Sequence, residues 1–298
     1  YSLTPLVNGA GMITLNPAKN VFASGEAVTV TATPSVGWTF MGWSGDAGGL
    51  ANPLAFSIDQ NKTITGNFAL VPGTVVGIND DPVYNQGDQY GQSTVPQGLS
   101  NVVAIAAGGY HNLALRNDGT LIAWGRNDFG QANIPAGLSN VAAIAAGQFY
   151  NLVLKTDGTV VDWGGVYVNG GVGVPSGLSN VVAIAAGDGH SLALREDGTV
   201  VAWGNNGYGE VNVPAGLSNV VAVAAGYYHS LALRGDGTVA AWGIGQYGAT
   251  NVPAGLSRVV AISAGHSYSL ALKDDGTVVG WGQGLSIPSG LTSVVAIS

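Results

Sequence analysis

One phrase occurs five times between residues 101 and 293, and this repetition constrains the fold more than any other feature. Each copy begins with a small apolar run that ends in Ala-Gly, continues through Leu-Ala-Leu or Leu-Val-Leu and Asp-Gly-Thr, and ends in Trp-Gly. The tryptophans recur at an almost constant spacing and are Trp124, Trp163, Trp203, Trp242 and Trp281. Short β segments at such a fixed period predict a radial or stacked array of identical units.

The third copy indicates how one unit is built. Its extended segments are residues 181–186, 191–195, 199–203 and a looser one at 210–214. Asp197-Gly198 joins the second and third segments, and Asp-Gly predicts a hairpin turn with positive φ at both central residues. Four antiparallel strands repeated radially form the blades of a β-propeller. We therefore expect an all-β chain with five near-complete four-stranded blades.

The two ends of the array contain pieces of a further blade. Residues 74–77 match a third strand without its tryptophan, residues 95–101 match a fourth strand, and residues 294–297 match a first strand. The second strand has no counterpart. We expect the ends to form one composite, incomplete blade of an array truncated at its C-terminus, with roughly six or seven blades in the intact protein.

Residues 1–70 lack the repeat. Apolar and polar residues alternate there in four runs, at 12–15, 27–33, 54–58 and 62–68, bounded by Asn-Gly, Asn-Pro, Ser-Gly or Thr-Pro pairs. This pattern predicts a small all-β module at 1–70, a linker at 71–73 and the propeller at 74–298. Trp38 and Trp43 fit either a carbohydrate-binding platform or the core of the module, and we favour the core.

Composition excludes several functions. The net charge is −8, and the nine basic residues form no cluster, so binding to nucleic acid is disfavoured. The chain has no cysteine, which excludes disulfides, thiol catalysis and cysteine-ligated zinc. No apolar run is long enough to predict a membrane span.

Residues 1–70 resemble a known family. The order Asn8-Gly9, Asn16-Pro17, Ser24-Gly25-Glu26, Gly37-Trp38 and Gly42-Trp43-Ser44-Gly45 is similar to that of the divergent internalin-type B-repeat family. Such modules are spacers in exported and cell-surface bacterial proteins. The resemblance therefore implies that the chain is secreted or displayed on a bacterial cell surface.

The repeats resemble a second family. Their His-Ser-Leu-Ala-Leu, Asp-Gly-Thr-Val and Ala-Trp-Gly phrases are similar to regulator of chromosome condensation repeats, in a short bacterial form. The resemblance implies a propeller over 74–298 and leaves the function open, because propellers carry unrelated activities. The short form is also similar to that of propeller-type β-lactamase inhibitory proteins. This similarity makes a β-lactamase-like enzyme or another envelope protein a candidate partner.

The two faces of the predicted propeller differ in sequence. On the face with the Asp-Gly turns, a basic residue recurs beside an aspartate, so we expect a solvated, structural ring of charge pairs. The opposite face carries the loops after Ala-Gly and after Trp-Gly, which differ from copy to copy. Exposed aromatic residues are typical of binding surfaces. The predicted ligand-binding residues on this aromatic loop face are Tyr110, Phe149, Asp188, Tyr227, Tyr228, Tyr167, Asp128 and His266.

Other aromatic residues on this face are predicted to pack rather than to bind. They precede glycine in one register and are Tyr90, Phe129, Tyr208 and Tyr247. Three histidines share another register, in which the other two copies have tyrosine: His111, His190 and His229. For this register we expect a hydrogen bond to a loop that fixes the tautomer of the ring, and no metal, because adjacent blades hold the rings apart.

Catalysis has little support in the sequence. The Ser residues that follow the histidines recur as strand residues, so they form no nucleophile–base pair. Asp80, Asp81 and Asp88 lack the spacing of a dedicated calcium loop. We expect no enzyme activity, no cofactor and no metal site.

The favoured function is a non-catalytic extracellular or cell-surface recognition module that binds a protein through the aromatic loop face. A glycan-binding adhesin, with the same tyrosines stacking on sugars, is the alternative. Guanine-nucleotide-exchange activity like that of the eukaryotic relatives is a third hypothesis, which the acidic charge disfavours.

Overall fold

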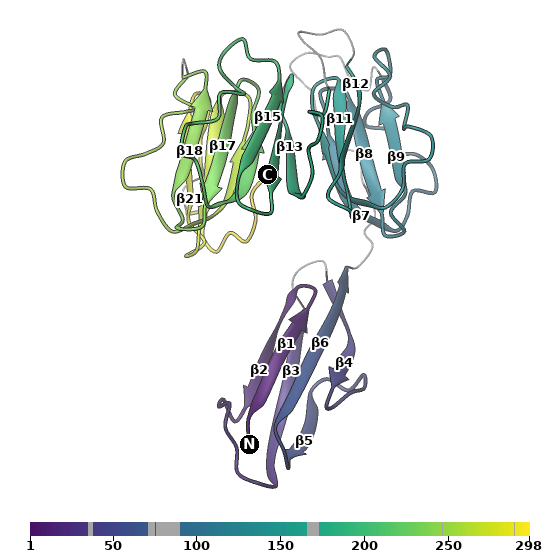
Figure 1. Cartoon of the computed structure of the whole chain (residues 1–298), viewed down its shortest axis with the longest axis vertical. Helices are drawn as coiled ribbons and strands as arrows, with labels where there is room; N and C mark the ends of the chain where they lie inside the picture. Colours follow the sequence, from purple (N-terminus) through teal and green to yellow (C-terminus); the bar gives the residue numbers. More distant parts are fainter. Residues whose placement is uncertain (35–37, 71–74, 76–89, 166–172, 246, 289) are drawn as a thin grey trace. The chain divides into compact units, whose positions relative to one another are not determined.

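The chain folds into two compact units, Tyr1–Thr74 and Val75–Ser298 (Figure 1). The computed structural model describes residues 1–34, 38–70, 75, 90–165, 173–245, 247–288 and 290–298. Strands are the regular elements throughout these segments, so the prediction of an all-β chain is confirmed. Within the same segments, no helix is long and apolar enough to cross a membrane.

The N-terminal unit consists of two three-stranded sheets. One has the order β1 (Leu3–Asn8), β6 (Lys62–Leu70), β4 (Trp38–Gly45), and the other β2 (Gly11–Asn16), β3 (Glu26–Pro34), β5 (Leu54–Ile58). Val28, Val30 and Ile64 are fully buried between them. Trp43 is 5% exposed, and its indole N–H donates to the Ala51 carbonyl over 2.9 Å. Trp38 packs against the same cluster, so the assignment of both tryptophans to the core is confirmed.

The second unit contains five three-stranded antiparallel sheets, one for each repeat (Figure 1). The blades are β7–β9 (Val102–Ala107, His111–Arg116, Leu121–Gly125), β10–β12 (Val141–Ala146, Tyr150–Lys155, Val160–Gly164), β13–β15 (Val181–Ala186, His190–Arg195, Val200–Gly204), β16–β18 (Val220–Ala225, His229–Arg234, Val239–Gly243) and β19–β21 (Val259–Ala264, Tyr268–Lys273, Val278–Gly282). The first strand of each blade contacts the first strand of the next. The repeats thus form a propeller, as the period predicted.

The expected fourth strand is absent from the described blades. Residues 210–214 form turns and irregular backbone, and Pro214 has no N–H to donate to a strand ladder. The Glu210 carbonyl instead accepts hydrogen bonds from Trp242 Nε1 (2.7 Å) and Ser230 Oγ (2.9 Å) of the next blade. The segment therefore fastens one repeat to its successor through side chains.

The composite blade is also not formed by the described residues. Residues 95–101 and 294–298 contain no strand, and Val295 is 82% exposed. A first strand needs the second strand of its own blade to complete its hydrogen-bond ladder, and residues 294–298 have no such partner among the described strands. Residues 74, 76 and 77, expected as a third strand, lie outside the described residues.

The hairpin turns differ from the prediction in one dihedral angle. Gly198 has a φ of 77°, whereas Asp197 is not among the residues with positive φ. Gly198 N–H donates to the Arg195 carbonyl over 3.0 Å, which closes a turn that continues into the third strand. Asp197 Oδ1 accepts from Thr199 N (2.9 Å) and Thr199 Oγ1 (2.6 Å). The aspartate therefore stabilises the turn through its side chain, and only the glycine adopts the left-handed conformation.

Candidate functional site

The loop after each first strand is fixed by a glycine. A Cβ on Gly187 would lie 2.4 Å from His190 Cε1 and 2.5 Å from the Gly226 carbonyl oxygen. Gly147 faces Tyr150 in the same way. No larger residue fits at this position, so its recurrence follows from packing.

The ring that packs on each of these glycines is buried and forms a hydrogen bond to the next blade. We call this set of rings the buried belt. His190 Nε2 lies 2.9 Å from Ser230 Oγ, and His229 Nε2 lies 2.9 Å from Ser269 Oγ. The members of the belt, each at most 3% exposed, are His111, Tyr150, His190 and His229. The expected hydrogen-bonding role of the histidines is confirmed, with partners in the next blade rather than in a loop.

Burial has a strong effect on these histidines. It lowers the pKa of His190 to about 4, with a smaller contribution from nearby His229, and it lowers the pKa of His229 to about 4. Both imidazoles are therefore neutral at physiological pH. In the part of the chain that the structure describes, no group of three His, Asp or Glu side chains could hold a metal ion.

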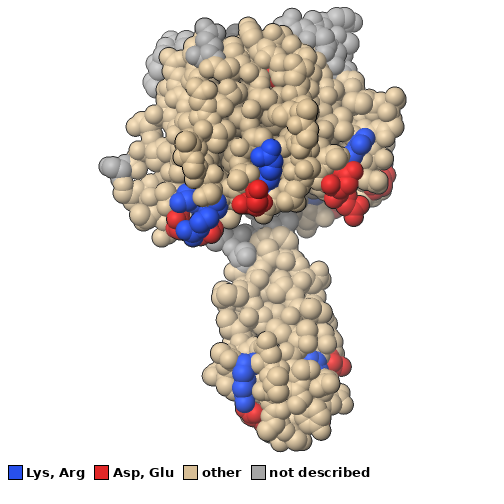
Figure 2. Space-filling model, turned by 60° about the vertical axis from the view of Figure 1, so that its left-hand side comes forward, with Lys and Arg blue, Asp and Glu red and all other residues tan. Residues whose placement is uncertain are grey.

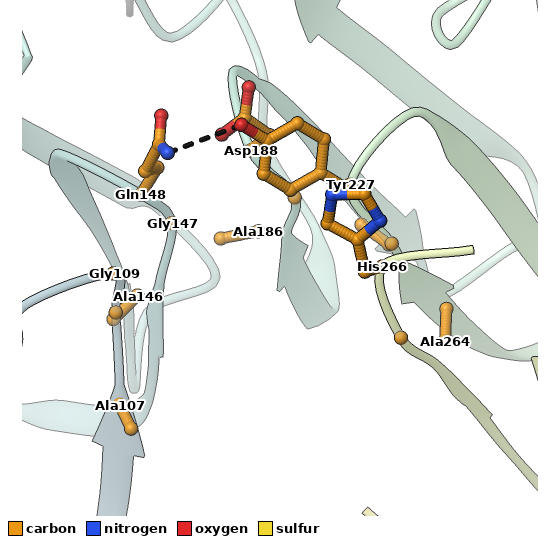
Figure 3. A pocket seen from close by; sticks show the side chains of 15 residues that line it. Ala107, Gly109, Ala146, Gly147, Gln148, Ala186, Asp188, Tyr227, Ala264 and His266 are labelled. Carbon is orange, nitrogen blue, oxygen red and sulfur yellow. Dashed lines mark hydrogen bonds between the residues drawn. The ribbon is translucent and has the colours of Figure 1, made fainter. Parts of the chain in front are cut away.

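The residue after each Ala-Gly lines a shared space at the centre of the loop face, which we call the axial pocket (Figure 3). Its volume is about 260 Å³, and the Ala-Gly pairs of all five blades line it. The residues that follow these pairs are Gly109, Gln148, Asp188, Tyr227 and His266. Three of the predicted site residues, Asp188, Tyr227 and His266, thus come together from three different blades.

Direct contacts connect the side chains of the axial pocket. Gln148 Nε2 donates to the Tyr227 hydroxyl over 3.3 Å, and Figure 3 shows both groups beside Asp188. The Tyr227 and His266 rings lie with centroids 4.3 Å apart and planes inclined by 35°. The backbone N–H of Tyr227 donates to the Gly265 carbonyl of the next blade over 3.2 Å, which fixes the backbone at this side of the axial pocket.

Asp188 is the carboxylate of the axial pocket. It is half-buried, and its Oδ1 atom is buried without a hydrogen-bond partner among the described residues. Burial raises the pKa of Asp188, whereas the Tyr227 hydroxyl and the nearby His266 lower it. A desolvated carboxylate oxygen without a donor is unfavourable unless a ligand supplies one.

In three of the five loops, the next residue lies in an outer ring of aromatic pairs. Tyr110 packs on Tyr90 with ring centroids 5.6 Å apart. Phe149 packs on Phe129 at 4.9 Å, and Tyr228 packs on Tyr208 at 4.7 Å. Each pair joins one repeat to its neighbour, so the residues predicted to pack and those predicted to bind are partners of one another.

Arg126 lies among two of these pairs. Its Cζ atom is 4.9 Å from the ring centroid of Tyr90 and 5.3 Å from those of Phe129 and Phe149. Arg126 Nε also forms an ion pair with Asp128 Oδ2 at 2.8 Å. The predicted site residue Asp128 is therefore occupied by an intramolecular partner.

The predicted site residue Tyr167 lies outside the described residues. The three aspartates that were rejected as a calcium loop, Asp80, Asp81 and Asp88, also lie outside them. Sequence reasoning singled out neither Gln148 nor Arg126. Gln148 could have been found from the repeat, because it follows Ala-Gly at the position equivalent to Asp188.

On the opposite face, basic and acidic side chains of the turns lie close together (Figure 2). Ion pairs join Lys155 to Asp157 at 3.0 Å and Lys273 to Asp275 at 3.3 Å. The arginines of the other three repeats form no such pair within the described part of the chain, so the expected ring of five charge pairs is incomplete. In all five repeats, the turn aspartate accepts a hydrogen bond from the backbone N–H of the turn threonine.

Two family descriptions match stretches of the chain, one in each unit. The Regulator of chromosome condensation (RCC1) repeat matches residues 102–131, 181–210, 220–249 and 259–286. The Divergent InlB B-repeat domain matches residues 1–72. No curated protein matches the chain.

Solved structures share the propeller fold. The chain is 25% identical to Prp20p of Saccharomyces cerevisiae, with a TM-score of 0.53 over 61% of this chain and 57% of that one. A yeast RCC1 (Prp20) structure with bound Kap60 is also 25% identical, with a TM-score of 0.52 over 61% of this chain and 56% of that one. The ectodomain of the Physcomitrella patens receptor kinase CR4 is 25% identical, with a TM-score of 0.54 over 63% of this chain and 54% of that one. The chain thus spans just over half the length of these proteins.

Proposed function

We propose that this chain, which carries Regulator of chromosome condensation (RCC1) repeats after a divergent InlB B-repeat domain, is a non-catalytic module that binds a protein through the loop face of its propeller. One observation carries the proposal. The five residues after Ala-Gly differ in every blade, yet all five line one axial pocket. A repeat scaffold gains no packing from that variety, so the variety is best explained by a ligand.

The loop face offers the contact area that a protein partner needs. Tyr110 and Tyr247 are each 41% exposed and Tyr208 is 49% exposed, although two of them pack on a neighbouring ring. Preorganised aromatic side chains lose little conformational entropy on binding and are enriched among residues that dominate interfaces. These rings surround the axial pocket as a rim of apolar surface.

The relatives support a protein as the class of ligand. The Prp20p structure was described with its binding to Gsp1p and histones, and another structure holds it with Kap60. Those partners belong to the yeast protein. For this chain, the divergent InlB B-repeat domain favours an extracellular or cell-surface bacterial setting, and we propose a β-lactamase-like or other envelope protein as the partner.

A glycan would need a different surface. Equivalent pockets repeated between blades would favour a sugar as the ligand, whereas here the variable residues converge on one pocket at the axis. A single site of mixed chemistry fits a protein surface better than a repeated sugar unit. The described lining residues include no serine, threonine, cysteine or lysine, the side chains most often used as nucleophiles.

The test is capture by the full chain from bacterial envelope extract. The variant carries Tyr110→Ala, Phe149→Ala, Tyr227→Ala and Tyr228→Ala. A matched control changes four turn aspartates of the opposite face to asparagine, which keeps a side-chain oxygen that can accept the turn hydrogen bonds. The four changes are Asp118→Asn, Asp157→Asn, Asp197→Asn and Asp236→Asn. We expect a protein retained by the wild type and the control and lost by the aromatic variant. Equal retention by all three chains would reject the loop face as the binding surface.

A further inference from the structure

We propose that the axial pocket binds one lysine side chain of the partner protein, with Asp188 as the counter-ion of the lysine ammonium. This inference rests on the proposed function, because it assigns part of the partner's chemistry. It starts from Asp188 Oδ1, a buried carboxylate oxygen with no hydrogen-bond donor among the described residues, at the wall of a cavity of about 260 Å³.

The charges around the cavity favour a cation. Among the described lining residues, Asp188 is the single carboxylate, and no lysine or arginine is present. Arg126, a basic residue of the loop face, is held by aromatic rings and by Asp128 instead. An incoming ammonium therefore meets one carboxylate that no lysine or arginine of the described lining neutralises. The setting is partly desolvated, where a charge-assisted hydrogen bond is strong.

The walls of the pocket suit the lysine stem. The inner strands approach one another at the axis, so each contributes only a methyl group, and the five are Ala107, Ala146, Ala186, Ala225 and Ala264. Such a wall can pack against the methylenes of an extended side chain. The ring of Tyr227, stacked on His266, adds an aromatic face within reach of a cation.

The hydrogen-bonding pattern favours lysine over arginine. Tyr227 contributes a hydrogen bond to the Asp188 carboxylate, and Gln148 is directed to the Tyr227 hydroxyl. One carboxylate oxygen therefore remains, which matches a point-like ammonium. A guanidinium gains its advantage from two parallel bonds to both carboxylate oxygens, and this pocket offers one.

Small probes test the assignment on the full chain without the partner. N-acetyl-lysine N-methylamide is titrated into the protein and followed by the backbone amide signals of Asp188 and Tyr227. The arginine and norleucine analogues are titrated in parallel. We expect saturable shifts with the lysine probe, weaker shifts with the arginine probe and none with norleucine.

Two variants complete this experiment. Asp188→Asn keeps the shape of the side chain and should weaken the lysine probe about tenfold, as expected for loss of a charge-assisted bond. Asp157→Asn removes a carboxylate from the opposite face and should leave the affinity unchanged. Unsaturable binding, equal binding of norleucine, tighter binding of arginine, or an unchanged affinity in Asp188→Asn would each overturn the proposal.

A final arm distinguishes this inference from the proposed function. Envelope extract is acetylated at its lysines before capture by the wild-type chain. Loss of retention after acetylation, and with Asp188→Asn, supports the lysine assignment. Retention unaffected by both changes overturns the lysine assignment and leaves the proposed function standing. Saturable binding of the lysine probe without any retained protein leaves the pocket assignment standing and rejects the proposed function.

Discussion

Residues 187–190 contain two kinds of position side by side. Gly187 and His190 recur in equivalent form around the ring, and both are buried against the next blade. Between them, Asp188 lies in the axial pocket, and its counterparts in the other blades all differ. The backbone that carries the variable residue is therefore held on one side by an invariant glycine and on the other by a buried histidine or tyrosine ring. The comparison teaches that, in this propeller, scaffold and recognition alternate residue by residue instead of occupying separate elements.

Lowering the pH should destabilise the buried belt, and this is the largest change in the free energy of unfolding that we predict. The neutral forms of His190 and His229 are favoured in the folded state, where each pKa is about 4 against an ordinary value of 6.5. The unfolded chain therefore binds more protons between these values, and the free energy of unfolding should fall as pH drops from 6.5 to 4, by about 3 kcal/mol at most for each histidine. Urea unfolding at a series of pH values measures this loss.

A tyrosine in place of a belt histidine is the matched control for the acid effect. Tyrosine already occupies this register at Tyr150 and Tyr268, against the equivalent glycines. His229→Tyr should fold and should reduce the loss of stability between pH 6.5 and 4. The turn aspartates contribute little to this loss, because the pKa of Asp157 and Asp275 is lowered to about 2 and most of their contribution is lost below pH 3.8. An unchanged pH dependence in His229→Tyr would contradict the assignment.

Gly187→Ala should give the next largest effect. The added methyl would lie 2.4 Å from the His190 ring and 2.5 Å from the Gly226 carbonyl oxygen, so the belt must move. We expect a loss of about 3 kcal/mol in the free energy of unfolding, at the upper end for an overpacked core. Gly173→Ala is the control, because no described residue lies within 4 Å of its Cβ position and its φ lies outside the left-handed region. Equal stability of the two variants would reject the packing explanation.

Ser230→Ala should destabilise the chain by a smaller amount. Ser230 Oγ bridges His190 Nε2 and the Glu210 carbonyl, both at 2.9 Å, so its removal leaves a buried ring nitrogen without a partner. Leaving buried polar groups unpaired costs about 2 kcal/mol. Chemical unfolding measures the change, and Ser230→Thr, which keeps the hydroxyl, should recover part of it.

The smallest expected effect has the opposite sign. Asp188→Asn removes a carboxylate that burial makes unfavourable, so the free energy of unfolding at pH 7 should stay the same or rise by up to about 1 kcal/mol. This gain should shrink at low pH, because the raised pKa protonates Asp188 in the wild type. A clear loss of stability in Asp188→Asn would place Asp188 in the scaffold and contradict its role in recognition.

The sequence was sufficient for the blades but not for the pocket. The constant spacing of the tryptophans and the Asp-Gly turns predicted the strands, because both depend on local chemistry. The fourth segment was misassigned, since the Trp242 and Ser230 bonds that hold Glu210 come from the next repeat. Equivalent residues in different blades meet only when the blades are arranged around one axis. For this reason Gln148 and Asp188, which belong to different repeats, could not be recognised as one site.

The aromatic residues illustrate the same limit. Tyr110 and Tyr90 were given different roles because their neighbours in sequence differ, yet their rings form one pair. A pattern can identify which positions vary. It does not reveal that Arg126 lies among four aromatic rings contributed by different repeats.

The most direct test makes the residues that follow Ala-Gly in the axial pocket uniform. A chain with Asp188→Gln, Tyr227→Gln and His266→Gln repeats the side chain of Gln148 in four blades and leaves the buried belt intact. Its thermal midpoint serves as the folding control. The account predicts a midpoint close to that of the wild type and loss of the envelope protein that the wild type retains. Retention at the wild-type level by a folded variant would contradict it.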